Sequence, residues 1–393
     1  MKIVFVHDHK IRRNNFQSKF YTDGKLTNEL FQRYIFNEND KIFAITRVID
    51  IENEQIGKLN LVDKENVIFN PVKGISPIDI FFKNFIFNIK VFKNITNSDM
   101  NIIRLPSFMG LFACLLSMLF RKKYFLELVG HARDSLIDKN SSFPKIFLAN
   151  LYSFFTKFFT KKASGVIYVT QYALQKDYPT SRMSAVASNV VIHISDHATK
   201  TNYQLSTNDC FKIGLIGSFN NHYKGIDFSI RTIALLRNRN IITHLHILGE
   251  GNLLSEYMKL ADELNVKDLI HFDGILPGGE PVKEWLDQLD LYIQPSLTEG
   301  LPRAMIEAMA RGLPVLASDV GGIPELLDSK YMLTRFDEKF FADMISELVT
   351  DENHRSLCGQ KNFMKSKQYD FSQLEENRRN FWMACRNTVE KSL

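Results

Sequence analysis

Cysteine is scarce in this sequence, and its spacing argues against two kinds of stabilising site. The four cysteines, Cys114, Cys210, Cys358 and Cys385, lie far apart and form no Cys-x-x-Cys pair. A disulfide framework and a zinc site are therefore not expected. The first residues, MKIVFVHDHK, lack the charged-then-apolar layout of a secretory signal and predict a short buried strand. We expect a protein of a reducing, cytoplasmic compartment.

Long hydrophobic runs are missing as well. The most apolar stretch, Leu111–Phe120, has ten residues, whereas a helix that spans a bilayer needs about 20. We expect it to form a core helix of the first domain. A second stretch, Phe143–Lys162, interleaves aromatic residues with lysines, a composition typical of a helix at a membrane surface. The alternative is that it is also a core helix.

Acidic residues are under-represented in the first half of the chain. Residues 1–200 contain 28 Lys and Arg against 17 Asp and Glu, a net charge of +11, whereas residues 201–393 carry −6. A basic domain suits an anionic partner, such as a membrane surface or a phosphate-bearing acceptor. The alternative is an ordinary solvated basic face. No RNA-binding signature accompanies the charge, so we expect no nucleic-acid partner.

Apolar runs alternate with helix-like stretches along the chain, which predicts an α/β fold with parallel sheets. A length of 393 residues favours two domains. The polar stretch 195–209 interrupts the alternation and is expected to be a linker. We therefore predict two Rossmann-like domains, 1–194 and 210–370, which face each other across a ligand-binding cleft. The amphipathic helix expected in 371–393 either closes the second domain or packs on the first.

The strand predictions are specific. In the first domain they fall at Lys2–Val6, Lys41–Arg47, Asn66–Phe69, Asp99–Arg104, Lys123–Leu128, Gly165–Val169 and Ala185–Val191. In the second domain they fall at Phe211–Ile216, Thr243–Leu248, Leu269–Phe272, Leu291–Gln294 and Pro314–Ala317.

The stretch 295–326 (PSLTEGLPRAMIEAMARGLPVLASDVGGIPEL) contains most of the chemistry. A strand ends before it, and a helix over Arg303–Arg311 follows, with its N-terminus at Gly300, Leu301 and Pro302. Free backbone N–H groups at such a position favour a phosphate. Glu299 and Glu307 cannot favour phosphate, but each carboxylate can accept hydrogen bonds from sugar hydroxyls. A nucleotide-sugar, with a diphosphate between a ribose and a sugar, fits this arrangement.

This motif closely resembles the signature of the retaining glycosyltransferases of family 4, which adopt the GT-B fold. The resemblance implies that Glu299 contacts the donor sugar and that Glu307 contacts the ribose. The alternative is two surface glutamates beside a helix.

A second match is the segment 214–225 (GLIGSFNNHYKG), where a glycine-rich turn that includes Gly217 allows close approach to a phosphate. The resemblance implies that Lys224 neutralises the diphosphate leaving group; the alternative is a solvated lysine. The family often has Arg at the position of Ser218, and Arg303 or His222 could substitute for that charge. The turn that contains Gly249 and Gly251 resembles one that lines the base pocket.

The first domain is expected to supply the acceptor side. The loop ELVGHARDS resembles the family loop that places a histidine near the reacting sugar carbon, here His131; the alternative is a surface histidine. The family's N-terminal glycine-rich loop corresponds to residues 8–25, although its paired glycines are missing. The candidates for contact with the acceptor are His7, Asp8, Tyr21 and Gly24.

These features predict a cytoplasmic hexosyltransferase that retains the configuration of the transferred sugar. No Asp-x-Asp, metal-ligand cluster or Walker loop stands out, so we expect no metal and no cofactor beyond the nucleotide-sugar substrate. The expected acceptor is a saccharide or lipid-linked saccharide of bacterial surface polysaccharide, with the enzyme peripheral on the inner face of the membrane. The alternatives are a sugar-nucleotide epimerase of the same fold and a non-catalytic nucleotide-sugar-binding protein.

Overall fold

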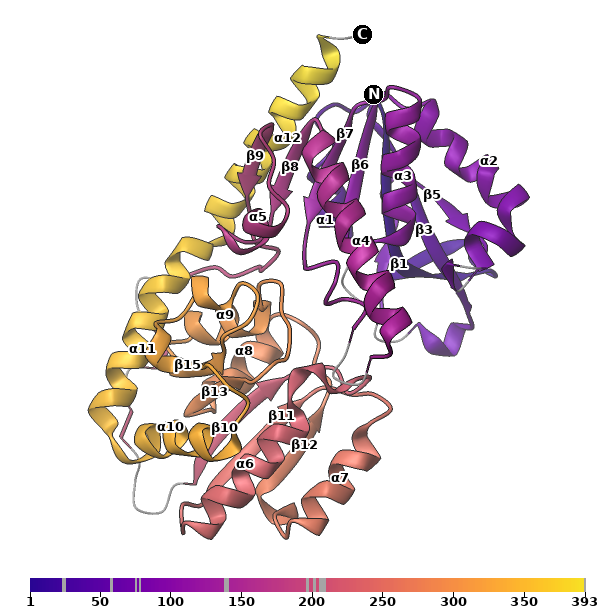
Figure 1. Cartoon of the computed structure of the whole chain (residues 1–393). Coiled ribbons are helices and arrows are strands. Elements are labelled where there is room, and N and C mark those ends of the chain that lie inside the picture. Colours follow the sequence, from indigo (N-terminus) through magenta and orange to yellow (C-terminus); the bar gives the residue numbers. More distant parts are fainter. Residues whose placement is uncertain are drawn as a thin grey trace. The chain divides into compact units, whose positions relative to one another are not determined.

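The computed structural model describes residues 1–22, 26–56, 59–74, 76–77, 79–137, 141–195, 198–200, 203–204 and 210–391 (Figure 1). The predicted acceptor contact Gly24 and most of the predicted linker 195–209 lie outside these ranges. The chain divides into two compact units, which we describe separately. Unit 1 comprises residues 1–187 and 375–393, and unit 2 comprises residues 188–374. Each unit is built around its own β-sheet.

Unit 1 contains a nine-stranded, mostly parallel sheet. Seven strands follow the order β4-β2-β1-β6-β7-β8-β9, while β3 pairs with β1, and β5 with β3. The strands are β1 (Lys2–Asn14), β2 (Lys19–Thr22), β3 (Lys41–Ile51), β4 (Asn60–Val62), β5 (Val67–Val72), β6 (Met100–Leu105), β7 (Tyr124–Leu128), β8 (Gly165–Tyr168) and β9 (Met183–Val186). Every residue of β6, β7 and β8 is buried, as expected for parallel strands covered on both faces.

Helices cover this sheet. The helical elements are α1 (Asn28–Gln32), the π-helical turn η2 (Asp79–Lys83), α2 (Phe85–Thr96), α3 (Phe108–Leu119), α4 (Phe143–Lys162) and α5 (Ala173–Asp177). Helix α3 packs on β1 and β6 and against both α2 and α4. No helix among the described residues is long and apolar enough to cross a membrane.

The first strand differs from its prediction. Instead of ending at Val6, β1 continues to Asn14 and turns back into β2, so the loop predicted over residues 8–25 is largely a hairpin. An irregularity in the pairing with β3 between Val6 and Lys10 lets the strand resume its register. Ile11 is then fully buried. The buried side chain of Ile11 thus helps to hold the part of β1 beyond Val6 on the sheet.

Unit 2 contains a six-stranded parallel sheet of order β12-β11-β10-β13-β14-β15. Its strands are β10 (Phe211–Ile216), β11 (Thr243–Leu248), β12 (Ile270–Gly274), β13 (Leu291–Gln294), β14 (Val315–Ser318) and β15 (Met332–Leu333). Its helices are α6 (Ile226–Asn238), α7 (Leu254–Glu263), α8 (Glu280–Asp287), α9 (Arg303–Ala310), α10 (Glu338–Thr350) and α11 (Glu352–Ser366). The predicted strands β10, β11 and β13 are confirmed at both ends.

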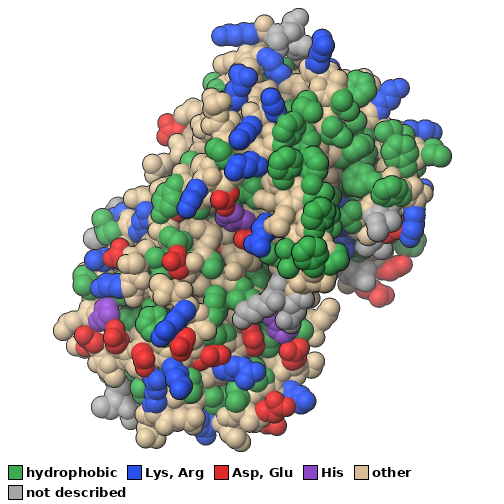
Figure 2. All heavy atoms as spheres, viewed as in Figure 1, with side chains coloured by type: hydrophobic (Ala, Val, Ile, Leu, Met, Phe, Trp, Pro, Cys, Tyr) green, Lys and Arg blue, Asp and Glu red, His purple; other side chains and the backbone are tan. Residues whose placement is uncertain are grey.

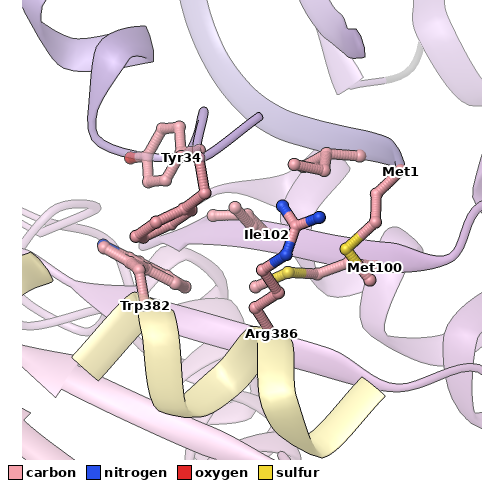
Figure 3. Close-up of a pocket in the computed structure, with 8 residues that line it drawn as sticks. Met1, Tyr34, Met100, Ile102, Trp382 and Arg386 are labelled. Atoms are coloured by element: carbon pink, nitrogen blue, oxygen red, sulfur yellow. The ribbon is translucent and has the colours of Figure 1, made fainter. Parts of the chain in front are cut away.

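The last helix, α12 (Phe371–Glu390), belongs to unit 1 from residue 375 onward. Its side chains close a small apolar pocket over β1 and β6, where Trp382 and Arg386 lie beside Tyr34 and Met100 (Figure 3). The rings of Trp382 and Tyr34 meet edge-on with centroids 5.1 Å apart. Arg386 donates a hydrogen bond of 2.6 Å to the buried Asp40. These contacts fix this part of the helix to unit 1.

Candidate functional site

The candidate site of unit 2 lies where the strand order reverses. From β10 the chain proceeds to β11 and β12 on one side, and β13, β14 and β15 then follow on the other side of β10. All neighbouring strands are parallel. In open α/β sheets of this kind, ligands bind beyond the carboxyl ends of the strands at the reversal. Here that position is formed by the loops after β10 and β13.

These two loops supply an ion pair between Lys224 and Glu299. Lys224 ends the short 3₁₀ turn that follows β10, and its Nζ lies 2.7 Å from Oε1 of Glu299, in the loop after β13. Both side chains are largely buried, at 14 and 9 % exposure. Burial alone would lower the pKa of Lys224, but the Glu299 carboxylate outweighs it and raises that pKa above its ordinary value. The site therefore holds a fixed positive charge.

Backbone contacts hold the surrounding loops together. The amide of Leu297 donates to the carbonyl of Tyr223 over 2.7 Å. Gly225 has a left-handed φ of 68°, and a Cβ there would lie 2.2 Å from the carbonyl oxygen of Pro295. Gly321, with a φ of 56°, brings the loop after β14 against Glu299 in the same way, since a Cβ would lie 1.9 Å from the Glu299 carbonyl oxygen. Only glycine allows these approaches.

Helix α9 begins beside Glu299 and brings in the second carboxylate. Pro302 stands at its N-cap and provides no side-chain cap, so its first amides remain available to a ligand. Glu307 lies in this helix and makes no hydrogen bond or ion pair with any residue that the structure describes. Burial raises its pKa, and Arg303 partly offsets this effect. A half-buried carboxylate that binds none of the described residues is available for a ligand.

The other predicted donor contacts gather at the same edge of the sheet. Gly217 and Gly249 follow the neighbouring strands β10 and β11, and a Cβ on Gly249 would lie 1.8 Å from the Gly217 carbonyl oxygen. Gly251 lies in the same turn as Gly249. The exposed Ser218 accepts a hydrogen bond from the side chain of Asn220 and so shapes its own loop. Gly300 and Leu301 precede α9, and Arg303 is exposed at its first turn.

Two residues of the site have no assigned role in the sequence analysis. Gln294 Nε2 and Ser296 Oγ both donate to Oε1 of Glu299, at 3.0 and 2.7 Å. Together with Lys224, they give this oxygen three donors, whereas Oε2 accepts from none of the described residues. Ser296 falls inside the recognised motif, so its place could have been noticed there. Gln294 is the last residue of β13, and because all four residues of that strand are buried, the sequence pattern does not show where its side chain points.

In unit 1, His131 lies in the loop after β7. Its Nδ1 lies 3.1 Å from a carboxylate oxygen of Asp177, and its side chain is 13 % exposed. The ring of Tyr178 lies nearby, at 6.1 Å between centroids. This carboxylate fixes the orientation of the imidazole, an arrangement typical of a positioned histidine.

The acceptor-side candidates in β1 and β2 are partly engaged within unit 1. Both carboxylate oxygens of Asp8 accept hydrogen bonds from the first amides of α3, those of Phe108 and Met109, at 2.6 and 3.1 Å. Burial raises the pKa of Asp8, and these amides lower it. His7 accepts a hydrogen bond from the amide of His9 within β1. Tyr21 is buried in β2, and its hydroxyl donates to Gln17.

The described residues also bear on metal binding. They contain no group of three or more His, Cys, Asp or Glu side chains that could hold a metal ion.

Among known sequences, some match part of this chain and at least one matches most of it. Residues 210–351, which contain the loops just described, match the family model for glycosyl transferases group 1. The chain is 31 % identical to Protein CapJ of Staphylococcus aureus over 360 residues, 90 % of this chain and 88 % of that protein. It is 30 % identical to the putative colanic acid biosynthesis glycosyltransferase WcaL of Escherichia coli over 167 residues, 39 % of this chain and 40 % of that protein.

Solved structures give the same fold over the whole length. Sucrose-phosphate synthase from Thermosynechococcus elongatus superposes with a TM-score of 0.70 at 13 % identity, covering 99 % of this chain and 100 % of that one. Anabaena HepE in complex with UDP and glucose gives a TM-score of 0.65 at 17 % identity, covering 96 and 97 %. At these identities the likeness shows the GT-B fold, which has two α/β units, and the family match supplies the activity.

Proposed function

This chain belongs to the group 1 glycosyl transferases, and we propose that it transfers a sugar with retention of configuration from a nucleotide-sugar, without a metal ion. The observation that carries the proposal is the Lys224–Glu299 pair at the strand reversal, 2.7 Å apart and held by loops from two neighbouring strands. It combines a fixed cation for a diphosphate with a carboxylate for sugar hydroxyls.

The donor is placed by complementary chemistry. Its diphosphate would accept hydrogen bonds from the first amides of α9 and from the ammonium of Lys224. Oε2 of Glu299 would accept hydrogen bonds from hydroxyls of the sugar on one side of the diphosphate, and the carboxylate of Glu307 would accept them from the ribose on the other side. The complexes of HepE with UDP-glucose and with UDP and glucose support a donor of this class.

The chemical step follows from these groups. As the bond between the sugar carbon and the phosphate oxygen breaks, negative charge develops on the diphosphate, and Lys224 stabilises it. The acceptor hydroxyl attacks the same face of the sugar and passes its proton to the departing phosphate oxygen. We assign His131 to the reacting sugar carbon and His7, Asp8, Tyr21 and Gly24 to the acceptor.

The acceptor that we propose is a saccharide or a lipid-linked saccharide of a bacterial surface polysaccharide. WcaL, a putative colanic acid biosynthesis glycosyltransferase, and AmsK, an amylovoran biosynthesis glycosyltransferase, are relatives whose names support this class of product. The net charge of +11 over residues 1–200 favours an anionic partner there. We place the enzyme in the cytoplasm and peripherally on the inner face of the membrane.

A donor screen tests this proposal. UDP-, GDP- and dTDP-sugars are added singly, and thermal unfolding is followed with the wild type and with Glu307→Ala. A donor at 100 times its Kd adds about 2.7 kcal/mol to the free energy of unfolding, so one nucleotide class should stabilise the wild type and act more weakly on the variant. Products of the stabilising donor incubated alone are then analysed. Conversion to an epimer, without any acceptor, would contradict the transferase assignment.

A further inference from the structure

The inward faces of α2, α3 and α4 in unit 1 are joined by aromatic rings. Phe112 of α3 meets Phe81 and Phe92 edge-on, with centroids 5.1 and 4.9 Å apart. On its other side, Phe108 of α3 stacks on Tyr152 of α4 at 4.5 Å. These contacts attach the three helices to one another, and α3 in turn packs on the sheet. The side chains that point away from them lie outside the core of this unit.

Those outward side chains are also hydrophobic. Of the 29 exposed large hydrophobic side chains in the described part of the chain, 16 lie on η2, α2, α4 and the end of α3. Figure 2 shows hydrophobic side chains gathered over this region, with Lys and Arg beside them. We call this surface the apolar face; it consists of Phe82, Phe85, Ile86, Phe87, Ile89, Leu115, Met118, Leu119, Phe120, Phe143, Phe147, Leu148, Leu151, Phe154, Phe155 and Phe158. Contiguous apolar surface of this kind marks an interaction site.

The distribution of residues on α4 shows that this exposure is not a by-product of covering the sheet. The buried stripe of α4 consists of Ala149, Tyr152, Thr156, Phe159 and Thr160, so only two of the seven aromatic side chains of this helix face inward. Phe147 and Phe154, at 63 and 62 % exposure, point outward from the same helix. A helix that only covers a core places its larger apolar side chains inward. The prediction that Phe143–Lys162 is an interfacial helix remains consistent with this pattern, whereas its interpretation as a purely core helix does not.

Charge indicates which partner fits. Helices α2, α3 and α4 contain six lysines and no aspartate or glutamate, and η2 adds Asp79 and Lys83, which pair with each other at 2.8 Å. The six lysines are Lys90, Lys93, Lys145, Lys157, Lys161 and Lys162, all of them exposed. Apolar side chains among basic ones match a lipid leaflet with anionic headgroups. A second copy of this chain would bring like charges together, which opposes pairing through this face.

We propose that the apolar face inserts into the headgroup region of an anionic lipid leaflet while the six lysines lie at the level of the phosphates. Phe82, Ile86 and Phe143, at 78, 79 and 81 % exposure, are the side chains that enter most deeply. Helix α2 and η2 therefore join α4 in one binding surface, which holds the enzyme reversibly without a spanning segment. The proposal rests on the membrane location given above and names the surface that produces it.

Vesicle sedimentation tests the hydrophobic part. The probe is vesicles of phosphatidylcholine with about 30 % phosphatidylglycerol. The test variant combines Phe82→Ser, Ile86→Ser, Phe147→Ser and Phe154→Ser. The matched control replaces four exposed hydrophobic side chains of unit 2 and combines Ile242→Ser, Met258→Ser, Leu357→Ser and Met364→Ser. We expect the test variant to bind roughly tenfold more weakly or worse and the control to bind as the wild type does.

A second variant tests the charge. Each basic residue near an anionic leaflet strengthens binding about fivefold, so changing Lys90, Lys93, Lys157 and Lys161 to Gln should weaken binding by about a hundredfold or more. The control changes the exposed unit 2 lysines Lys259, Lys267, Lys339 and Lys361 to Gln. Wild-type binding should also fall as salt is added. Thermal unfolding midpoints close to that of the wild type show that each variant is folded.

Several outcomes would overturn the proposal. One is a wild-type protein that stays in the supernatant at low salt. Another is a serine variant that binds vesicles as the wild type does. The third is a control variant whose vesicle binding weakens as much as that of the matching test variant. Light scattering that shows a dimer abolished by the serine variant, without vesicle binding, would assign the apolar face to a second copy instead. Vesicle binding requires neither donor nor acceptor, so its failure leaves the transferase assignment intact, and a loss of transferase activity leaves vesicle binding interpretable.

Discussion

Lys224 and Glu299 are 75 residues apart in the sequence, and their side chains lie 2.7 Å apart. The contact joins the loops that follow two neighbouring parallel strands, β10 and β13. An ammonium group has three donors, so Lys224 can keep Glu299 and still bind a phosphate oxygen. The pair thus places its positive charge before the donor arrives, and little reorganisation is needed during the reaction.

We predict that Lys224→Ala lowers kcat/KM about a hundredfold to a thousandfold, because it removes the charge that stabilises the departing diphosphate. Lys259→Ala is the control, since that lysine is exposed on α7 and, in the described part of the chain, pairs only with Glu263 at 3.5 Å. Steady-state kinetics with the donor found in the screen measures both. If the two variants are equally active, a group other than Lys224 neutralises the charge of the diphosphate.

The two glutamates should have different kinetic effects. Glu307→Gln is expected to raise the KM for the donor roughly tenfold with little change in kcat, because a ribose contact contributes equally to the bound substrate and the transition state. Glu299→Gln should lower kcat by about a hundredfold, since it removes the charged partner of Lys224 beside the reacting sugar. The difference between the two variants is the test. If Glu299→Gln raises KM and leaves kcat unchanged, Glu299 binds the substrate and the transition state equally well and does not assist the chemical step.

Activity should persist in excess EDTA, because the Lys224 ammonium and the amides of α9 can together neutralise the diphosphate. The measurement compares initial rates before and after chelation, and again after Mg²⁺ or Mn²⁺ is added back. Rates that collapse on chelation and recover with either ion would show that a metal takes the role assigned to Lys224.

The sequence predicts unit 2 more completely than unit 1. Strands β10, β11 and β13 begin and end where their apolar runs do, and the motif around Glu299 and Glu307 predicts one edge of the sheet. Local patterns suffice there because each of these parallel strands is a short segment of four to six residues, with apolar residues alternating or in a row, that ends at its loop. Gln294 could not be assigned, because its contact with Glu299 depends on how the loop after β13 folds back over the end of that strand.

Unit 1 depends more on long-range pairing. The extension of β1 to Asn14 is held by β3 and β2, and β2 in turn pairs with β4, about 40 residues further on. Nothing in the local pattern of residues 8–25 fixes such pairing. Periodicity also cannot show which side of an apolar helix faces inward. The prediction of Leu111–Phe120 as a core helix therefore holds for only one side: Ala113 and Cys114 are buried, whereas Leu119 and Phe120 are exposed.

The attachment of α12 to unit 1 depends on Arg386 and Asp40 (Figure 3). Burial would raise the pKa of Asp40, but the guanidinium of Arg386 and the amino group of Met1 outweigh it and hold the pKa at about 2. Arg386→Met leaves this buried carboxylate with one cation fewer, so we expect a loss of about 2 kcal/mol of stability. Arg379→Met, on the exposed side of the same helix, is the control and should change stability by less than about 0.5 kcal/mol. Urea unfolding at neutral pH compares them.

A stack of imidazoles should make unit 2 sensitive to mild acid. His244 and His246 on β11 and His271 on β12 lie nearly parallel, with the rings of His246 and His271 4.5 Å apart. Nδ1 of His244 lies 2.9 Å from Nε2 of His271, a hydrogen bond that needs at least one neutral ring. Burial first, and then the charge on His246, lowers the pKa of both His244 and His271.

Because the folded state binds these protons less readily than the unfolded chain, the stability from the neutral rings is complete above the unfolded pKa of about 6.5. It is lost as pH falls through that value toward the lower folded pKa. We expect the urea midpoint to drop between about pH 7.5 and about pH 5. His271→Gln should flatten this dependence, because it removes one histidine with a lowered pKa and takes the imidazole partner away from His244. His222→Gln, at an exposed histidine of the same unit, should leave the slope unchanged; equal slopes in all three proteins would place the acid-sensitive groups outside the stack.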